Sequence, residues 1–214
     1  MSLAVAPILV PLLFGALSLA LWRYRIAQRV LGVVGTLVLL AVSIRLFQVV
    51  HAEGMVVLHM GGWAAPLGIT LAVDMLGAIM VVLTGITGLA IALFSMGDTP
   101  ERHEHFGYYP LMHLLLAGVA GSFVTGDIFN LYVWFEVMLI ASFALLTLGG
   151  ERAQMEGAIK YVTLNLFSSA IFLSAIGILY GLLGTLNMAD IAQKIDQVEN
   201  TAMINVVAVM FMVA

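Results

Sequence analysis

Glu136 is the only charged residue in the stretch from Ile128 to Leu148. About 20 apolar residues are enough for a helix to cross the hydrocarbon core of a bilayer. A carboxylate near the middle of such a helix costs on the order of 3 kcal/mol on insertion scales. A residue kept at that cost is expected to have a function, so Glu136 is the first candidate for a functional site.

The composition indicates an integral membrane protein. Of the 214 residues, 63% are hydrophobic and 9% are charged, and the mean hydropathy is +1.12. Soluble domains carry about 25% charged residues. The chain has no cysteine, which excludes disulfides, thiolate zinc sites and iron–sulfur ligation. We expect no metal and no cofactor, and the net charge of −4 gives no reason to expect nucleic-acid binding.

Six hydrophobic segments are long enough to span a bilayer, and a seventh begins near Ala202. The six lie at about 3–22, 28–50, 71–96, 107–125, 128–148 and 156–183. The seventh has about 13 residues when the sequence reaches Ala214, which is short of a full span. We therefore predict an all-α membrane protein with a single transmembrane domain over residues 1–214, and expect it to be the N-terminal fragment of a longer polypeptide.

Basic residues are concentrated in alternate loops. The first, third and fifth loops carry Arg23, Arg25, Arg29, Arg102 and Arg152, whereas the opposite side has only Lys194 in a loop and Arg45 near a helix end. The positive-inside rule then places the odd loops in the cytoplasm and the N-terminus outside.

Two short segments are predicted to lie at the outer face. The stretch from Gly54 to Thr70 is rich in glycine, contains Pro66 and has apolar runs too short to span, which favours a small β-hairpin. The stretch from Met188 to Val198 has the pattern of a short amphipathic helix.

Glu136 lacks a cationic partner on its own predicted helix. With a period of 3.6 residues, only Tyr132 and Thr147 are polar on the face that Glu136 occupies. A cation or water from another helix is therefore needed, unless the carboxyl group is protonated at rest. Both states suit a group that binds and releases protons. A purely structural hydrogen bond to a neighbouring helix is the alternative.

Lys160 is the second candidate. It lies about one turn inside the segment 156–183, where its ammonium group could instead extend to the interface. Thr163 and Ser174 lie within about 60° of Lys160 around the helix, so this face can hold water. A buried lysine also changes its protonation state readily, as a proton carrier must.

His113 is a weaker candidate, placed about 9 Å inside its segment, where it could relay protons or simply pack. Asp127 and Asp74 are expected to cap helices. Arg45 is expected to extend to the interface, and pairing with Asp74 is left open.

Two further patterns are interpreted as structural. The charged segment Asp98 to His105 resembles a metal cluster in composition only, and a solvated loop is favoured. Gly177 and Gly181 form a small-xxx-small pair of the kind that permits close helix packing.

Three segments resemble the multisubunit Na⁺/H⁺ antiporter (Mrp) family, in particular its D-type antiporter-like chain. They run from Gly126 to Leu146, from Gly61 to Asp74 and from Ala158 to Ala192. The family is similar to the antiporter-like proton-pumping subunits of respiratory complex I and of membrane-bound hydrogenases.

The resemblance implies a bundle of about fourteen helices with two inverted five-helix repeats. In that pattern Glu136 matches a helix-five glutamate that pairs with a lysine on a broken helix seven, and Lys160 matches a lysine at the start of helix six. No lysine follows Lys194, so the expected partner of Glu136 and the second repeat are absent from this sequence.

These observations predict a non-enzymatic, proton-translocating subunit of a monovalent cation (Na⁺)/H⁺ antiporter in a bacterial inner membrane. Its expected partners are other subunits, protons, Na⁺ and the lipid bilayer. Glu136 and Lys160 would carry the relay, with His113, Tyr132, Thr163 and Ser174 as further candidates. The alternatives are a proton-pumping subunit of a complex I-like or hydrogenase-like oxidoreductase, and a non-transporting assembly fragment.

Overall fold

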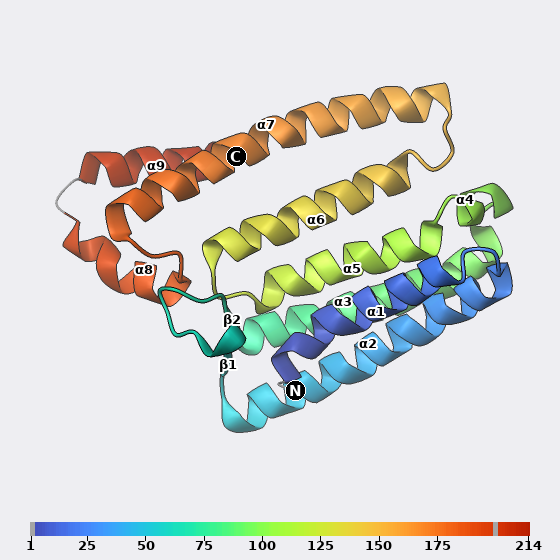
Figure 1. Cartoon of the computed structure of the whole chain (residues 1–214), viewed down its shortest axis with the longest axis horizontal. Coiled ribbons are helices and arrows are strands. Elements are labelled where there is room, and N and C mark those ends of the chain that lie inside the picture. Colours follow the sequence, from blue (N-terminus) through green and yellow to red (C-terminus); the bar gives the residue numbers. More distant parts are fainter. Residues whose placement is uncertain (1–2, 199–200) are drawn as a thin grey trace.

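The computed structural model describes residues 3–198 and 201–214, and every structural statement below refers to this part of the chain. Most of it is helical (Figure 1). The helices are α1 (Ala6–Ala20), α2 (Arg25–Glu53), α3 (Met75–Asp98), α4 (Glu101–His105), α5 (Tyr108–Val124), α6 (Ile128–Leu146), α7 (Arg152–Leu183), α8 (Met188–Lys194) and α9 (Thr201–Val213). Short 3-10 turns lie at Leu3–Val5, Met60–Gly62 and Ile195–Gln197.

Helix α5 connects two groups of helices. On one side it packs against α1 and α3, and α5 forms a four-helix bundle with α1, α2 and α3. On the other side it packs against α6, which contacts α7, and α7 in turn contacts α9 (Figure 1). The residues of α6 and α7 thus lie outside the first bundle, with α5 between the two groups.

Five helices of the described part are long and apolar enough to cross a membrane. They are α1 with its preceding 3-10 turn, α2, α3, α6 and α7. The apolar helices α5 and α9 have 17 and 13 residues. At 1.5 Å per residue, α5 is about 25 Å long, at the lower limit for a span. The all-α membrane architecture is confirmed, whereas six full spans stay a prediction.

A short antiparallel hairpin lies at one end of the bundle. Strand β1 (Val56–His59) pairs with β2 (Thr70–Val73) in a register that joins Val56 to Val73. The predicted hairpin is confirmed, but its second strand includes residues that we assigned to the third span. That helix begins at Met75, because Asp74 is extended and its carboxylate accepts a hydrogen bond of 2.7 Å from the Gly77 amide.

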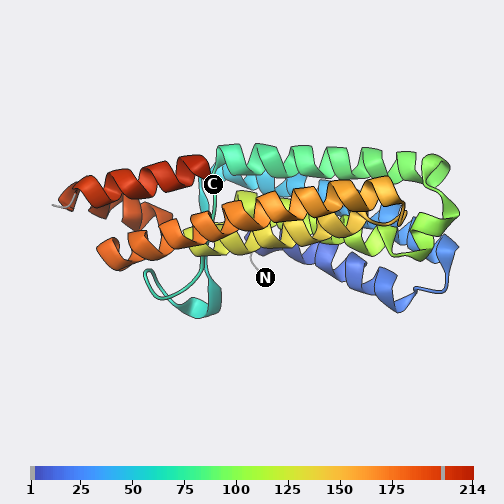
Figure 2. The same cartoon turned by 90° about the horizontal axis from the view of Figure 1, so that it is seen from above.

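Helix α8 lies at the same end as the hairpin, as predicted, and the β1–β2 connection projects away from the long helices (Figure 2). The tight turn between α5 and α6 ties these elements together. The Gly126 amide donates to the Thr70 carbonyl at 2.8 Å, and the Gly126 carbonyl accepts from the Met188 amide at 2.9 Å. We call this the hairpin end.

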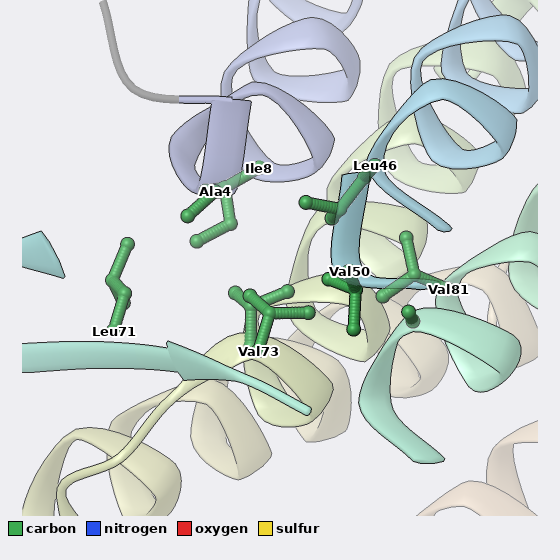
Figure 3. Packing of buried hydrophobic residues seen from close by; sticks show 9 residues of the cluster. Ala4, Ile8, Leu46, Val50, Leu71, Val73 and Val81 are labelled. Carbon is green, nitrogen blue, oxygen red and sulfur yellow. The ribbon is translucent and has the colours of Figure 1, made fainter. Parts of the chain in front are cut away.

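A buried apolar cluster lies at the base of the hairpin (Figure 3). Leu71 and Val73 from β2 meet helical residues from α1, α2 and α3, including Ile8, Val50 and Val81. Because alternate strand residues share a face, Leu71 and Val73 both point into this cluster. The hairpin is thereby anchored to the first bundle.

The segment 98–105 is not the solvated loop that we expected. It contains α4, and the Glu104 side chain is buried, with 2% of its area exposed. Its carboxylate accepts a hydrogen bond of 2.8 Å from Arg29 and another from Arg25, and the Tyr109 hydroxyl lies 3.2 Å away. The prediction was wrong because local charge density does not indicate partners 75 and 79 residues away.

The structure also bears on the pairing of Arg45 with Asp74, which the sequence left open, and on the expected close packing at Gly177 and Gly181. Within the described residues, Arg45 donates to Gln48 at 3.3 Å and forms no ion pair with Asp74. A Cβ on Gly177 or Gly181 would have no neighbour within 4 Å there, so this pair is not at a helix contact. Close packing occurs instead at Gly121 of α5, where a Cβ would overlap the Trp134 ring of α6.

Glu104→Ala should destabilise the protein by about 3 kcal/mol, because it leaves two arginines without their shared partner. Burial of the Glu104 carboxyl raises its pKa, but the hydrogen bonds from Arg29 and Arg25 outweigh this and hold it below 4.5. The contribution is therefore present at neutral pH and is lost as the pH falls below 4.5.

Thermal unfolding of the purified full-length protein in detergent checks this prediction. Glu101→Ala is the matched control, since Glu101 also pairs with Arg25 but its side chain is 75% exposed. Equal destabilisation by the two substitutions would contradict the role given to Glu104.

Candidate functional site

Glu136 lies on the face of α6 that meets α7. The Ser169 hydroxyl of α7 is hydrogen bonded to the Glu136 carboxylate, and it also lies 3.3 Å from the Tyr132 hydroxyl. Tyr132 precedes Glu136 by one helical turn, which brings both side chains to the same residue of α7. The structure thus joins two of the predicted site residues through a serine on a different helix.

Two cavities border the half-buried Glu136 side chain. The larger has a volume of about 490 Å³ and lies between α6, α7 and the end of α9, where Phe211 and Ala214 line it. The smaller, of about 130 Å³, adjoins Glu136 and α7. Both have room for water, and the larger has polar groups that can hold it.

The polar lining of the larger cavity comes from both helices. Ser142 of α6 and Tyr161 of α7 are joined by a hydrogen bond of 3.1 Å between their hydroxyl groups. Asn165 and Ser168 of α7 line the cavity as well. These groups can orient water next to Glu136, and water is the medium through which protons pass between side chains.

Glu136 has no ion-pair partner within the described part of the chain. Its only hydrogen-bond donor there is a hydroxyl group. This agrees with the sequence, in which α6 offers no cation.

Lys160 lies apart from this cluster. Its ammonium group pairs with Glu156 one turn earlier at 2.8 Å, and both side chains are largely exposed, at 72% and 68%. Lys160 lines neither of the cavities beside Glu136. Because α7 begins at Arg152 rather than Glu156, Lys160 is about two turns inside the helix instead of one.

Thr163 and Ser174 are also exposed. Thr163 donates to the Ile159 carbonyl at 2.8 Å, and Ser174 donates to the Ala170 carbonyl at 2.7 Å. These hydroxyl groups are occupied by their own helix. The structure therefore does not bring Thr163 or Ser174 to Glu136.

His113 is fully buried in a different seam. Its ring lies against Phe14 of α1, with 6.1 Å between centroids, and a Cβ on Gly35 of α2 would come within 2.6 Å of it. Neither ring nitrogen has a hydrogen-bond partner within the described residues. His113 thus belongs to the first bundle, on the side of α5 away from α6.

Sequence reasoning missed the serine and its neighbours on α7. Tyr161, Asn165, Ser168, Ser169 and Phe172 recur at helical spacing and all line the larger cavity. A polar stripe with this period inside an apolar helix is a usable signal of a face directed toward a protein interior. The stripe was missed because no member carries a charge.

Comparison with known proteins shows which proteins the chain is similar to. Residues 125–214, which include α6, α7 and α9, match the model of the family described as "NADH:quinone oxidoreductase/Mrp antiporter, TM". The D-type chain of the Na⁺/H⁺ antiporter of Alkalihalophilus pseudofirmus is 41% identical over 212 residues. The chain is thus similar to this antiporter-like family in sequence over residues 125–214 and to its D-type chains over nearly all of its own length.

That relative is longer than the chain, since the match covers 99% of the chain and 43% of the relative. Two solved structures share the fold. The membrane-bound sulfane sulfur reductase, an archaeal respiratory membrane complex, matches 97% of the chain and 43% of its own chain, with 27% identity and a TM-score of 0.89. The Mrp complex from Dietzia sp. matches 99% of the chain and 40% of its own, with 28% identity and a TM-score of 0.85.

Ser169→Ala should increase the reaction of Glu136 with a carbodiimide, a reagent to which protonated carboxyl groups add. The serine donates to the carboxylate, and loss of a hydrogen bond to a charged group is worth about 1.5–3 kcal/mol. Removing it should favour the protonated form and raise the labelling rate several-fold. Mass spectrometry of the peptide containing Glu136 measures the rate.

Ser174→Ala is the control for this experiment, because Ser174 is on the same helix but its hydroxyl bonds only to the Ala170 carbonyl. Equal labelling in the two variants would show that the contact with Ser169 does not govern the protonation of Glu136.

Proposed function

We propose that this chain is the proton-translocating part of a subunit of a multisubunit Na⁺/H⁺ antiporter, a membrane transporter rather than an enzyme. Glu136 is the residue that binds and releases the proton. Its partners are other subunits of the complex, and Na⁺ is the exchanged cation. This assignment extends the function of the relative from Alkalihalophilus pseudofirmus to the present chain.

The observation that carries the proposal is the setting of Glu136. A carboxyl group in the middle of an apolar helix adjoins two cavities, and hydroxyl and amide groups of α6 and α7 line the larger one. An intramembrane carboxyl group beside polar space is the arrangement expected of a proton-binding site. A purely structural carboxyl group would be enclosed by fixed donors without adjoining space.

Helix α9 approaches the cavity beside Glu136. Phe211 and Ala214 line the same cavity as Glu136, so the seventh apolar segment approaches the site. The family resemblance places a lysine on that helix. A cation that approaches Glu136 would favour its ionised form, and withdrawal of the cation would favour proton uptake.

The free energy of a change in the proton affinity of Glu136 is similar in size to the free energy of moving a charge across the membrane. A tenfold change in proton affinity is worth about 1.4 kcal/mol. Moving one charge through a membrane potential of about 100 mV is worth about 2.3 kcal/mol. A change of one or two decades in the proton affinity of Glu136 is therefore enough to couple this site to the proton gradient.

The positive-inside rule assigns the arginine-rich end of the bundle to the cytoplasm. This end carries Arg23, Arg25, Arg29, Arg102 and Arg152. The hairpin end then faces outward together with the N-terminus. On this assignment Lys160, in the half of α7 near the arginine-rich end, would supply protons from the cytoplasm. The bacterial relatives indicate a bacterial cell membrane.

A redox-driven proton pump is the second candidate function. The likeness to a chain of an archaeal respiratory membrane complex favours it. In that case partner subunits would supply the driving energy, and proton movement would need an electron donor. Proton flux driven by a Na⁺ gradient alone, in vesicles without an electron donor, separates the antiporter from the pump.

Glu136→Gln in the full-length protein should abolish Na⁺-dependent proton flux in inverted membrane vesicles while the complex still assembles. The amide keeps the shape of the side chain but cannot exchange a proton at neutral pH. Glu53→Gln, at the exposed end of α2, is the control and should transport normally. Normal flux in Glu136→Gln would refute the proton site and favour an assembly role.

Lys160 is tested in the same assay by two single substitutions. If Lys160 carries protons, Lys160→Ala should slow transport and change its pH optimum, whereas Glu156→Ala should not. If Lys160 serves only as the partner of Glu156, the two substitutions should have equal, small effects, because the pair is exposed. An unchanged pH profile in Lys160→Ala would return this residue to an interfacial role.

A further inference from the structure

An apolar groove runs between α1 and α5, on the far side of α5 from Glu136. Its volume is about 330 Å³, and every residue that lines it is apolar or glycine. Ala16 and Leu19 form part of one wall, and Pro110 and Leu114 form part of the other. Leu12, Ala16 and Leu19 are exposed, so the groove opens sideways from the bundle.

A second cavity adjoins the groove at the arginine-rich end. It has a volume of about 310 Å³ and shares Phe106 and Leu111 with the groove. Its remaining lining includes Arg102 of α4 and the turn between α6 and α7 at Gly149 and Gly150. Figure 1 shows α4 and this turn at the same end of the molecule. The apolar groove thus ends beside this second cavity, which we call the cationic mouth because Arg102 lines it.

The charge at this mouth is not compensated within the described residues. Arg102 has no ion-pair partner there, while the two carboxylates of the same short helix, Glu101 and Glu104, are both bound by Arg25, and Glu104 by Arg29 as well. The Arg102 guanidinium lies over the Phe106 ring at 5.8 Å. The ring holds the cation at the entrance and leaves its N–H groups available to an oxygen ligand.

Aromatic residues line the end of the groove that adjoins α4. Trp22 and Phe106 are both exposed, and both line the groove where α1 and α4 end. Tryptophan is enriched at the level of lipid headgroups, where an apolar body meets water. The site is therefore apolar within the span, aromatic at its margin and cationic beyond it. This order matches the acyl chains, glycerol region and phosphate of a phospholipid.

We propose that this groove binds an anionic phospholipid, with an acyl chain between α1 and α5 and the headgroup phosphate on Arg102. The charge of the mouth favours an anionic lipid over a zwitterionic one. A bound lipid would fill the seam beside the first bundle without contact with Glu136. The proposal does not rest on cation transport, so it can fail or hold independently of the proposed function.

The test uses the full-length protein, isolated in its membrane complex and freed of loosely bound lipid. It is illuminated with phosphatidylglycerol that carries a photoreactive group in one acyl chain, or with phosphatidylcholine of identical chains. Mass spectrometry then locates the adducts. We expect the phosphatidylglycerol probe to label α1 and α5 around the groove about five-fold more than the phosphatidylcholine probe.

Three variants complete the design. In Arg102→Gln the preference for phosphatidylglycerol should be lost, so that the two lipid probes label the groove about equally. Arg23→Gln removes the same charge from the same end, but Arg23 lines neither cavity, so the preference should persist. Ala16→Trp should fill the groove and abolish labelling by both probes, and the exposed position of Ala16 makes it tolerable for folding.

Equal labelling by the two lipids in the unmodified protein would overturn the headgroup site. Labelling that remains in Ala16→Trp would overturn the acyl groove. Full competition by inorganic phosphate would indicate a free-anion site instead of a lipid site. Adducts of the phosphatidylglycerol probe that lie only outside α1 and α5 would also overturn the proposal.

Discussion

A carboxyl group placed in hydrocarbon must be neutral or be surrounded by donors and water, and Glu136 is the residue on which this constraint acts. The remaining features of α6 and α7 follow from it. A hydroxyl group of α7 reaches the carboxylate, and polar side chains from both helices line the adjoining cavity. An apolar helix without these neighbours would not keep a carboxylate at this depth.

The position of α6 is fixed at its ends and along its length. Asp127 caps the helix, because its carboxylate accepts a hydrogen bond of 2.8 Å from the backbone amide of Asn130. Gly126 ties the preceding turn to β2 and α8. Along the helix, Gly118 and Gly121 of α5 lack the side chains that would collide with Met138 and Trp134. The hairpin end and α5 thus hold Glu136 against α7, although none of these groups touches it.

Local patterns were enough to predict the caps at Asp74 and Asp127, the hairpin and α8, because each depends on residues close in sequence. Contacts between distant residues were not predictable in this way. Ser169 is 33 residues from Glu136, and Arg25 is 79 residues from Glu104. The polar stripe of α7 could be recognised from its helical spacing, but the residues that it contacts, like the partners of a salt-bridged loop, are fixed by tertiary packing that one sequence does not reveal. The same limit explains why Lys160, Thr163 and Ser174 were grouped with Glu136 although they line neither of its cavities.

The central claim is that Glu136 exchanges a proton in the folded protein. Infrared difference spectroscopy of the full-length protein, titrated across the pH range of transport, measures this through the carbonyl stretching band of a protonated carboxylic acid. The account predicts a band that grows as the pH falls and is absent from Glu136→Gln. A pH-dependent band that survives in Glu136→Gln, or no such band in the unmodified protein, would contradict it.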